Sequence, residues 1–253
     1  MKKIAYILGI ICAMTMQSCL DLEPKTQLAD TNYWKSPEHF KLFATQFYSW
    51  SADFRWLDDS QHADIRSDLF AGSTVNIYSN GTNSIPSSDK HYTDNYNRIR
   101  QTNTLLQQAD TYEQQADIAI SVGEARFFRA YCYFNLVRAF GEVPLVTYKI
   151  NDASEANIPK TTVDKIYEQI DTDLKTAEES LPETWSTEYT GRLTWGAARS
   201  LHARTYMMRS DWDNMYKAST DVINKGLYNL KTPYNEIFTD DGENSGGSIF
   251  ELQ

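Results

Sequence analysis

The sequence predicts an all-α fold made of helical hairpins that are joined by long irregular loops. Two observations support this fold class. Apolar residues recur every three or four positions in the segments 36–50, 89–109, 113–140, 161–182 and 194–224, a spacing that places them on helix faces. Gly141, Pro182 and Gly226 stand where three of these segments end, as helix-terminating residues do.

Composition and charge restrict the class of ligand. The chain has 253 residues, 41% hydrophobic and 23% charged, which is typical of a globular protein. Its formal net charge is −10, and it becomes −12 (22 basic against 34 acidic residues) if Lys2 and Lys3 are removed with the amino-terminal segment. Such a surface repels phosphate backbones, so nucleic-acid binding is disfavoured. A neutral ligand such as a sugar is compatible with it.

Residues 1–18 have the pattern of a secretory signal peptide: two lysines, a short apolar run, then small and polar residues. The apolar run is too short to span a bilayer comfortably. Cys19 follows directly, which is the position of the lipidated cysteine in a bacterial lipoprotein. We therefore expect Cys19 to become the first residue and to carry the lipid that holds the protein on a membrane. Residues 19–30 are predicted to form an extended surface tether.

Residues 31–253 are predicted to form one helical domain. Its first helix is expected to begin at Ser36-Pro37-Glu38, which offers an N-cap, a proline at the first position and an acid in the first turn. The aromatic residues that follow are spaced by three and four and share one face: Phe40, Phe43, Phe47 and Trp50. Residues 52–90 are rich in Asp, Ser, Asn and Gly, and predict a long irregular loop.

The helix predicted to end at Phe140, before Gly141, has polar residues on two sides. On a helical wheel, Glu124, Asn135 and Arg138 share one stripe, and Arg126 and Arg129 lie nearly opposite. The rest of the surface is apolar or aromatic. These polar residues exclude a membrane span. The pattern instead predicts a helix wedged between neighbouring helices, with its arginines paired to carboxylates.

Two further segments complete the predicted fold. Residues 161–182 carry one apolar stripe and predict a single helix. Residues 194–224 predict two helices with a turn at Ser210-Asp211, and small alanines alternate there with bulky residues. That alternation lets antiparallel helices approach closely, as in a tetratricopeptide hairpin. The end of the chain, from Ile249 to Leu252, is typical of the beginning of a strand.

No catalytic motif is present, so we expect a protein that is not an enzyme and needs no cofactor or metal. The sequence lacks a nucleophile elbow, a zinc-protease motif, a phosphate loop and a dinucleotide fingerprint. The four histidines, His39, His62, His91 and His202, are scattered, which favours structural or surface roles. Paired acids are too common here to indicate a glycosidase.

Aromatic residues in and beside the irregular loop suggest a sugar-binding surface, because sugars stack their C–H faces on aromatic rings. Trp50, Trp56, Phe70, Tyr78 and Tyr92 belong to this group, and the loop adds Arg, Asp and Asn side chains for hydroxyl groups. Packing of these rings in the core beneath the loop is the alternative.

Several motifs together resemble the amino-terminal half of the SusD/RagB-family outer-membrane lipoproteins of Bacteroidota. The likeness spans essentially the whole chain after the signal peptide. The motifs are Cys-Leu-Asp-Leu-Glu-Pro from residue 19, Tyr-Trp-Lys-Ser-Pro-Glu from residue 33, Tyr96-x-x-Ile99-Arg100-x-x-Asn103, and EARFFRAYCYFNLVRAFGEVPL from residue 124 to residue 145. The last of these is the most specific.

The resemblance implies a tetratricopeptide-bearing scaffold at the cell surface that captures glycans. It also implies a partner, a SusC-type TonB-dependent transporter, over whose mouth the lipoprotein closes. In this family a Trp commonly precedes the Tyr-x-x-Ile motif by four residues as a sugar platform, and here that place holds Tyr92. With Asn95 one turn on and Trp56 in the loop, Tyr92 is the predicted glycan site. Family members are about twice as long, so this chain is expected to be a fragment or a truncated product.

The sequence therefore leaves three possible functions to consider. The first is a lipid-anchored glycan-binding protein at the outer membrane that delivers oligosaccharide to the transporter. The second is a tetratricopeptide adaptor at the same membrane that binds no ligand. The third, a secreted glycoside hydrolase, is disfavoured by the missing catalytic signature.

Overall fold

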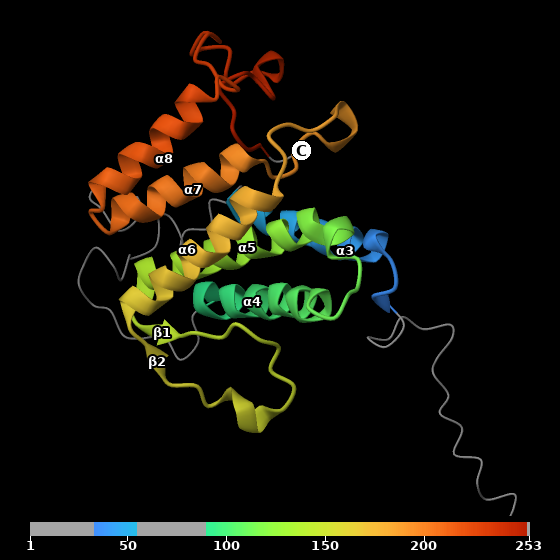
Figure 1. The fold of residues 1–253 in the computed structure, drawn as a ribbon. Helices are drawn as coiled ribbons and strands as arrows, with labels where there is room; N and C mark the ends of the chain where they lie inside the picture. The colour runs from blue at the N-terminus through green and yellow to red at the C-terminus, as the bar shows by residue number, and fades with distance from the viewer. Residues whose placement is uncertain (1–32, 55–89, 252–253) are drawn as a thin grey trace, which may run out of the picture.

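The computed structural model describes residues 33–54 and 90–251, and within them the fold is all-α, as predicted (Figure 1). The signal segment, Cys19, the tether and the loop that holds Trp56 lie outside the described residues. The α-helices are α3 (Pro37–Thr45), α4 (Lys90–Ala109), α5 (Gln115–Phe140), α6 (Val163–Ser180), α7 (Trp195–Met208) and α8 (Trp212–Asn224). The 3-10 helices are η1 (Gln46–Phe54), η3 (Ala153–Ala156), η4 (Thr187–Tyr189) and η5 (Asp240–Gly242).

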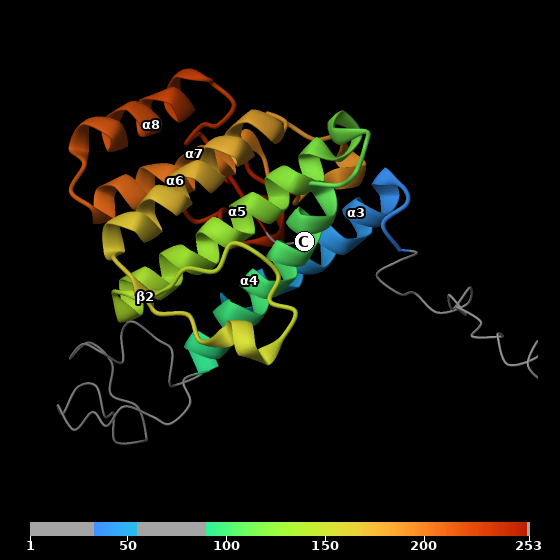
Figure 2. The same cartoon turned by 60° about the horizontal axis from the view of Figure 1, so that its bottom comes forward.

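Successive helices pack side by side, so the chain builds a layered stack. Helix α4 contacts α5, α5 contacts α6, α6 contacts α7, and α7 contacts α8, while α3 packs on α5 (Figure 2). This order is the packing of a helical repeat protein, in which each hairpin buries its apolar face against its neighbours. It confirms the tetratricopeptide-like hairpin predicted for residues 194–224.

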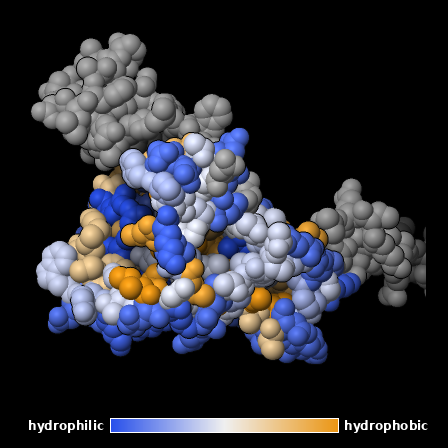
Figure 3. All heavy atoms as spheres, turned by 90° about the horizontal axis from the view of Figure 1, so that it is seen from above, coloured by the Kyte–Doolittle hydropathy of each residue, from blue (hydrophilic) through white to orange (hydrophobic). Residues whose placement is uncertain are grey.

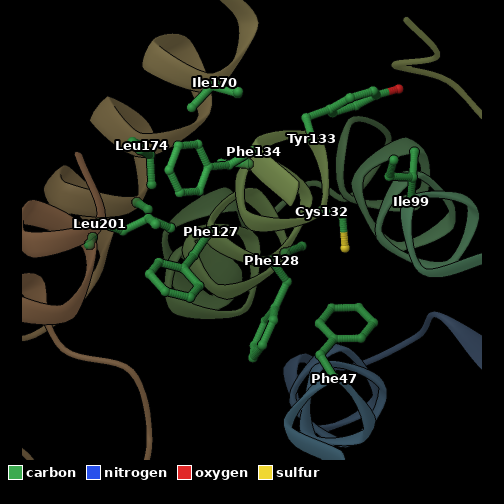
Figure 4. Close-up of a cluster of buried hydrophobic side chains, with 14 of the residues drawn as sticks. Phe47, Ile99, Phe127, Phe128, Cys132, Tyr133, Phe134, Ile170, Leu174 and Leu201 are labelled. Carbon is green, nitrogen blue, oxygen red and sulfur yellow. The ribbon is translucent and has the colours of Figure 1, made fainter. Parts of the chain in front are cut away.

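Helix α5 lies in the middle of the stack and is buried on more than one side, as its two polar stripes predict. Figure 4 shows Phe134 directed toward Ile170 and Leu174 of α6, while Phe128 is directed toward Phe47 of η1. All five side chains belong to one core cluster. Close approach also occurs at Gly123, where an added Cβ would lie 2.8 Å from the Ser180 Cβ. Larger residues at position 123 would therefore push α6 away.

The helix ends follow the predicted signals. Pro37 occupies the first turn of α3, although the Ser36 side chain makes no capping bond. Helix α5 ends at Gly141, which has a φ of +69°, a conformation that residues with a Cβ rarely adopt. Side-chain caps do form later in the chain: Thr194 accepts from the Ala197 amide at the start of α7, and Asp211 accepts from the Asn214 amide at the start of α8.

The prediction of a strand at the end of the chain is wrong for residues 249–251, the part that the structure describes. Residues 249–251 are not paired with another strand, and Ile249 and Phe250 instead pack against the core cluster. Their alternating pattern reflects contact with helices rather than with a sheet. The sheet found within 33–54 and 90–251 is a two-residue antiparallel pair, β1 (Val143–Pro144) and β2 (Lys160–Thr161). This pair brings together the two ends of the long segment that connects α5 to α6.

Among the described residues, no helix combines the length and the hydrophobicity that crossing a bilayer requires.

Candidate functional site

An aromatic cluster lies where the first turns of α4 meet the end of α5. The ring centroids of Tyr92 and Phe140 are 5.2 Å apart in an edge-to-face arrangement, and those of Tyr92 and Tyr96 are 4.8 Å apart. The His91 ring lies 6.1 Å from Phe140. Tyr92 is half-buried and Phe140 is 38% exposed. We call these four residues, His91, Tyr92, Tyr96 and Phe140, the α4–α5 aromatic cluster.

Tyr96 fixes the base of this cluster. Its hydroxyl donates a hydrogen bond to the carbonyl oxygen of Pro144 at 2.7 Å, which ties α4 to β1. Burial raises the pKa of Tyr96 far above its usual range, because the ionised phenolate would lose its hydration. The side chain therefore stays a neutral donor at any physiological pH and keeps its ring against that of Tyr92.

The three predicted glycan-binding residues are placed differently. Tyr92 is part of the cluster and keeps exposed surface. Asn95 is fully buried: its Nδ2 donates to the His91 carbonyl at 2.7 Å, and its Oδ1 has no hydrogen-bond partner. The Asn95 amide thus lies beneath the surface rather than on it. Trp56 lies outside the described residues.

Phe140 belongs to the cluster but is not among the residues predicted from the sequence. It is 48 positions from Tyr92 in the chain, and only the antiparallel packing of α4 on α5 brings the two rings together. Its position in the sequence indicates exposure. Phe140 is the last helical residue before Gly141, so no further turn of the helix covers its side chain.

The motif residues of α4 and α5 hold the backbone that follows β1. Tyr133 Oη donates to the Val146 carbonyl at 2.9 Å and accepts from the Val146 amide at 2.7 Å. Asn103 Nδ2 donates to the carbonyls of Val146 and Tyr148, both at 3.0 Å. These bonds satisfy backbone groups of Val146 and Tyr148, which lie outside the helices and the sheet. The family-like motifs of residues 96–103 and 124–145 therefore build the scaffold.

Arg126 and Arg129 are paired with a carboxylate, as predicted. Arg129 donates to both oxygens of Asp173, from Nε at 2.8 Å and from Nη2 at 2.7 Å, and Arg126 Nη1 reaches Asp173 Oδ1 at 2.9 Å. Arg129 also donates to Asn103 Oδ1 at 2.8 Å and to the Thr147 carbonyl at 3.2 Å. One buried arginine thus joins α4, α5, α6 and the segment after β1.

The polar stripe on the other side of α5, which contains Glu124, also forms hydrogen bonds and an ion pair. Glu124 accepts two bonds from Arg192, at 2.9 and 2.6 Å, and one from the Tyr48 hydroxyl at 2.5 Å. The bidentate geometry is the strong form of a carboxylate–guanidinium pair. It anchors the loop before α7 to the centre of the stack, which explains how a buried glutamate is accommodated.

The described residues contain no candidate metal site. No group of three or more His, Cys, Asp or Glu side chains gathers there as a metal site would require. Burial raises the pKa of Cys132 to about 12, so its thiol is not a nucleophile. The α4–α5 aromatic cluster offers ring faces and edges, which suit stacking rather than bond cleavage.

Comparison with known proteins identifies the family. Residues 19–207 match the SusD-like family described as "Starch-binding associating with outer membrane". A SusD-like protein of Bacteroides ovatus is 22% identical over 270 residues, covering 97% of this chain and 48% of that protein. A SusD-like protein of Formosa agariphila is 37% identical over 103 residues, covering 40% of this chain and 20% of that protein.

Solved structures share the fold. A SusD-like protein of Bacteroides fragilis has a TM-score of 0.72 at 24% identity, covering 89% of this chain and 46% of that one. A structure described as a laminarin-binding SusD-like protein has a TM-score of 0.74 at 22% identity, covering 84% of this chain and 50% of that one. The chain spans half or less of the length of these relatives. Because the family match extends over most of its residues, the chain belongs to the SusD-like family.

Proposed function

We propose that this chain is a non-catalytic glycan-binding protein at the outer membrane, which captures oligosaccharide and passes it to a SusC-type TonB-dependent transporter. The observation that carries the proposal is the family match over residues 19–207, to a family described by starch binding and outer-membrane association. A solved relative of the same fold is described as binding laminarin, a second neutral glucan, by its own name.

The α4–α5 aromatic cluster supports the proposal physically. The ring of Tyr92 is half-buried and contacts the rings of Tyr96 and Phe140, which limit its movement. A ring fixed in this way loses little conformational freedom when a sugar stacks on it, so more of the contact energy appears as affinity. The net charge of −10 does not oppose an uncharged glycan.

The proposed site has Tyr92 as its platform, with Phe140 beside it. Asn95 belongs to the layer below, where its hydrogen bond to the His91 carbonyl steadies the first turns of α4. Trp56 stays a proposed member from the loop that precedes α4. This assignment gives the aromatic rings the binding role and gives the buried amide a supporting role.

We also propose that Cys19 carries a lipid that anchors the protein at the cell surface. Replacement of Cys19 by Ala in the full chain should move the protein from the membrane fraction to the soluble fraction after cell lysis. Retention of Cys19→Ala in a carbonate-washed membrane fraction would contradict the anchor. A Cys132→Ala variant is the matched control, because its thiol is buried and should leave the distribution unchanged.

Calorimetric titration tests glycan capture. The described fold begins at residue 33, so protein lacking residues 1–19 retains all of it. We expect soluble starch, laminarin or another neutral polysaccharide of a plant, algal and host panel to bind saturably. A folded protein that binds no member of this panel would contradict glycan capture. Release of reducing sugar during the titration would contradict the non-catalytic role.

A second candidate, an adaptor that contacts protein without binding a ligand, is favoured by the outer face of α8. Trp212, Tyr216 and Ile223 lie within about 40° on the helical wheel and are 57%, 71% and 74% exposed. The molecule seen from above carries apolar side chains among hydrophilic ones (Figure 3). Exposed apolar groups of this kind are typical of protein contacts. Failure of every glycan to bind, with transporter binding in detergent abolished by Tyr216→Ser, would favour the adaptor.

A further inference from the structure

His202 of α7 is fully buried and faces two carboxylates of α6. Its Nδ1 lies 2.6 Å from Glu178 Oε1, and its Nε2 lies 3.3 Å from Asp171 Oδ1. The ring is stacked on Tyr206, with centroids 4.4 Å apart and planes 19° apart. Nδ1 is within hydrogen-bond distance of Glu178, whereas Nε2 lies near Asp171 without a hydrogen bond of good geometry. The side chains of Asp171 and Glu178 are 21% and 14% exposed.

The positions of the two carboxylates favour a ring that is protonated on both nitrogens. A neutral imidazole donates from one nitrogen only, and its other nitrogen carries a lone pair. A carboxylate opposite that lone pair would be repelled, since both atoms are acceptors. Each carboxylate faces a proton on the ring only when His202 is the imidazolium, which carries a proton on both nitrogens.

The surrounding charges also favour the protonated form of His202. Arg209 of α7 donates to both oxygens of Asp171, at 3.0 and 2.8 Å. Arg199 of α7 contacts Glu178 at 3.2 Å and Asp221 of α8 at 2.6 Å. With a protonated His202 the network has three cations and three anions, and with a neutral His202 it has two cations and three anions. The network is therefore balanced only in the protonated state.

We propose that His202 is a protonation-dependent clasp that fastens the α7–α8 hairpin to α6, and that this attachment weakens as the pH rises. The groups that face the ring are Asp171 and Glu178 from α6, and Tyr206 from α7. Arg199, Arg209 and Asp221 complete the network around those carboxylates. The same hairpin carries the exposed face of α8, so the clasp controls how firmly that face is held to the body of the protein.

The pKa of His202 has the direction that the clasp requires. Burial lowers the pKa of the imidazole, but the neighbouring carboxylates of Asp171 and Glu178 stabilise the protonated ring more strongly and raise the pKa above its usual value. A histidine with a raised pKa in the folded state adds stability that is fully present below the unfolded-state pKa of about 6.5. That stability is lost as the pH rises from there through the folded-state pKa.

Hydrogen exchange read by mass spectrometry tests the clasp in the protein lacking residues 1–19. We expect the opening constant of α7–α8 amides to rise by up to about tenfold per pH unit between the unfolded-state and folded-state pKa values of His202. Amides of α4 and α5 should not follow this change. Rates are corrected for the intrinsic pH dependence of exchange.

A matched set of variants separates the clasp from a general effect of pH. In His202→Gln the α7–α8 amides should exchange faster at low pH and lose the pH dependence, whereas His39→Gln should behave as the wild type does. If His202→Gln fails to fold, Glu178→Gln is used, and the His202 resonance in its NMR titration should move to lower pH. A wild-type α7–α8 exchange that is independent of pH, or a His202 that titrates at or below about pH 6.5, would overturn the proposal.

Discussion

Arg129 and Asp173 face each other across the α5–α6 interface with both side chains almost fully buried, joined by two hydrogen bonds of 2.8 and 2.7 Å. Removal of one member of a buried pair costs about 3–5 kcal/mol when the other charge is left alone. In Arg129→Ala the Asp173 carboxylate keeps Arg126 at 2.9 Å, so the low end of that range applies. We expect Arg129→Ala to lower the free energy of unfolding by about that amount. Chemical denaturation followed by circular dichroism measures the change.

The matched control is Arg138→Ala on the same helix. Arg138 is exposed and lies over the Phe134 ring at 4.9 Å from its centroid, so its loss should cost less than about 1 kcal/mol. Equal destabilisation by the two variants would contradict the structural role of the buried pair. The folded fraction of Arg129→Ala should keep the glycan affinity of the wild type, because Arg129 lies in the scaffold.

The hydroxyl of Tyr133 should matter for stability in the same way, on a smaller scale. Tyr133→Phe keeps the ring but leaves the Val146 amide and carbonyl without this partner, at a cost of about 1–3 kcal/mol. The melting temperatures of Tyr133→Phe and Tyr216→Phe measure this loss of stability. Tyr216→Phe is the control, because Tyr216 is 71% exposed. An unchanged melting temperature for Tyr133→Phe would mean that the segment after β1 is held by other contacts.

Much of the fold follows from local sequence signals. Helix α5 ends at the predicted residue because Gly141 supplies a positive φ that most residues avoid. Its two polar stripes predicted contacts on two sides, and the pairing of Arg126 and Arg129 with Asp173 confirms both the burial and the pairing. Periodicity and end signals are encoded within a few residues, so a single sequence carries them.

Relations between helices could not be predicted in the same way. The sequence predicts a structural or surface role for His202 but does not indicate its partners. Asp171 and Glu178 lie seven residues apart on one face of α6, and both lie close to the His202 ring. This proximity depends on the register of α7 against α6, which residue spacing alone does not determine. The burial of Asn95 and the contact of Tyr92 with Phe140 depend likewise on how α4 packs on α5.

The thiol of Cys132 should be unreactive in the folded protein. Burial removes it from solvent and raises its pKa to about 12, so almost no thiolate exists at pH 8. In protein lacking residues 1–19, Cys132 is the one remaining cysteine. A thiol-reactive dye should therefore label a small fraction of native protein and one thiol per chain in denaturant. Rapid labelling of native protein would show that the centre of α5 opens readily.

Glycan affinity in two tyrosine variants tests the proposed binding site most directly. Tyr92→Ala removes the proposed platform, and Tyr216→Ala removes a more exposed tyrosine on the far helix α8. For a polysaccharide that binds the wild type, we expect Tyr92→Ala to raise Kd by about tenfold, or about 1.4 kcal/mol, and Tyr216→Ala to leave Kd unchanged. Unchanged affinity in a folded Tyr92→Ala variant would contradict the assignment of the site to the α4–α5 aromatic cluster.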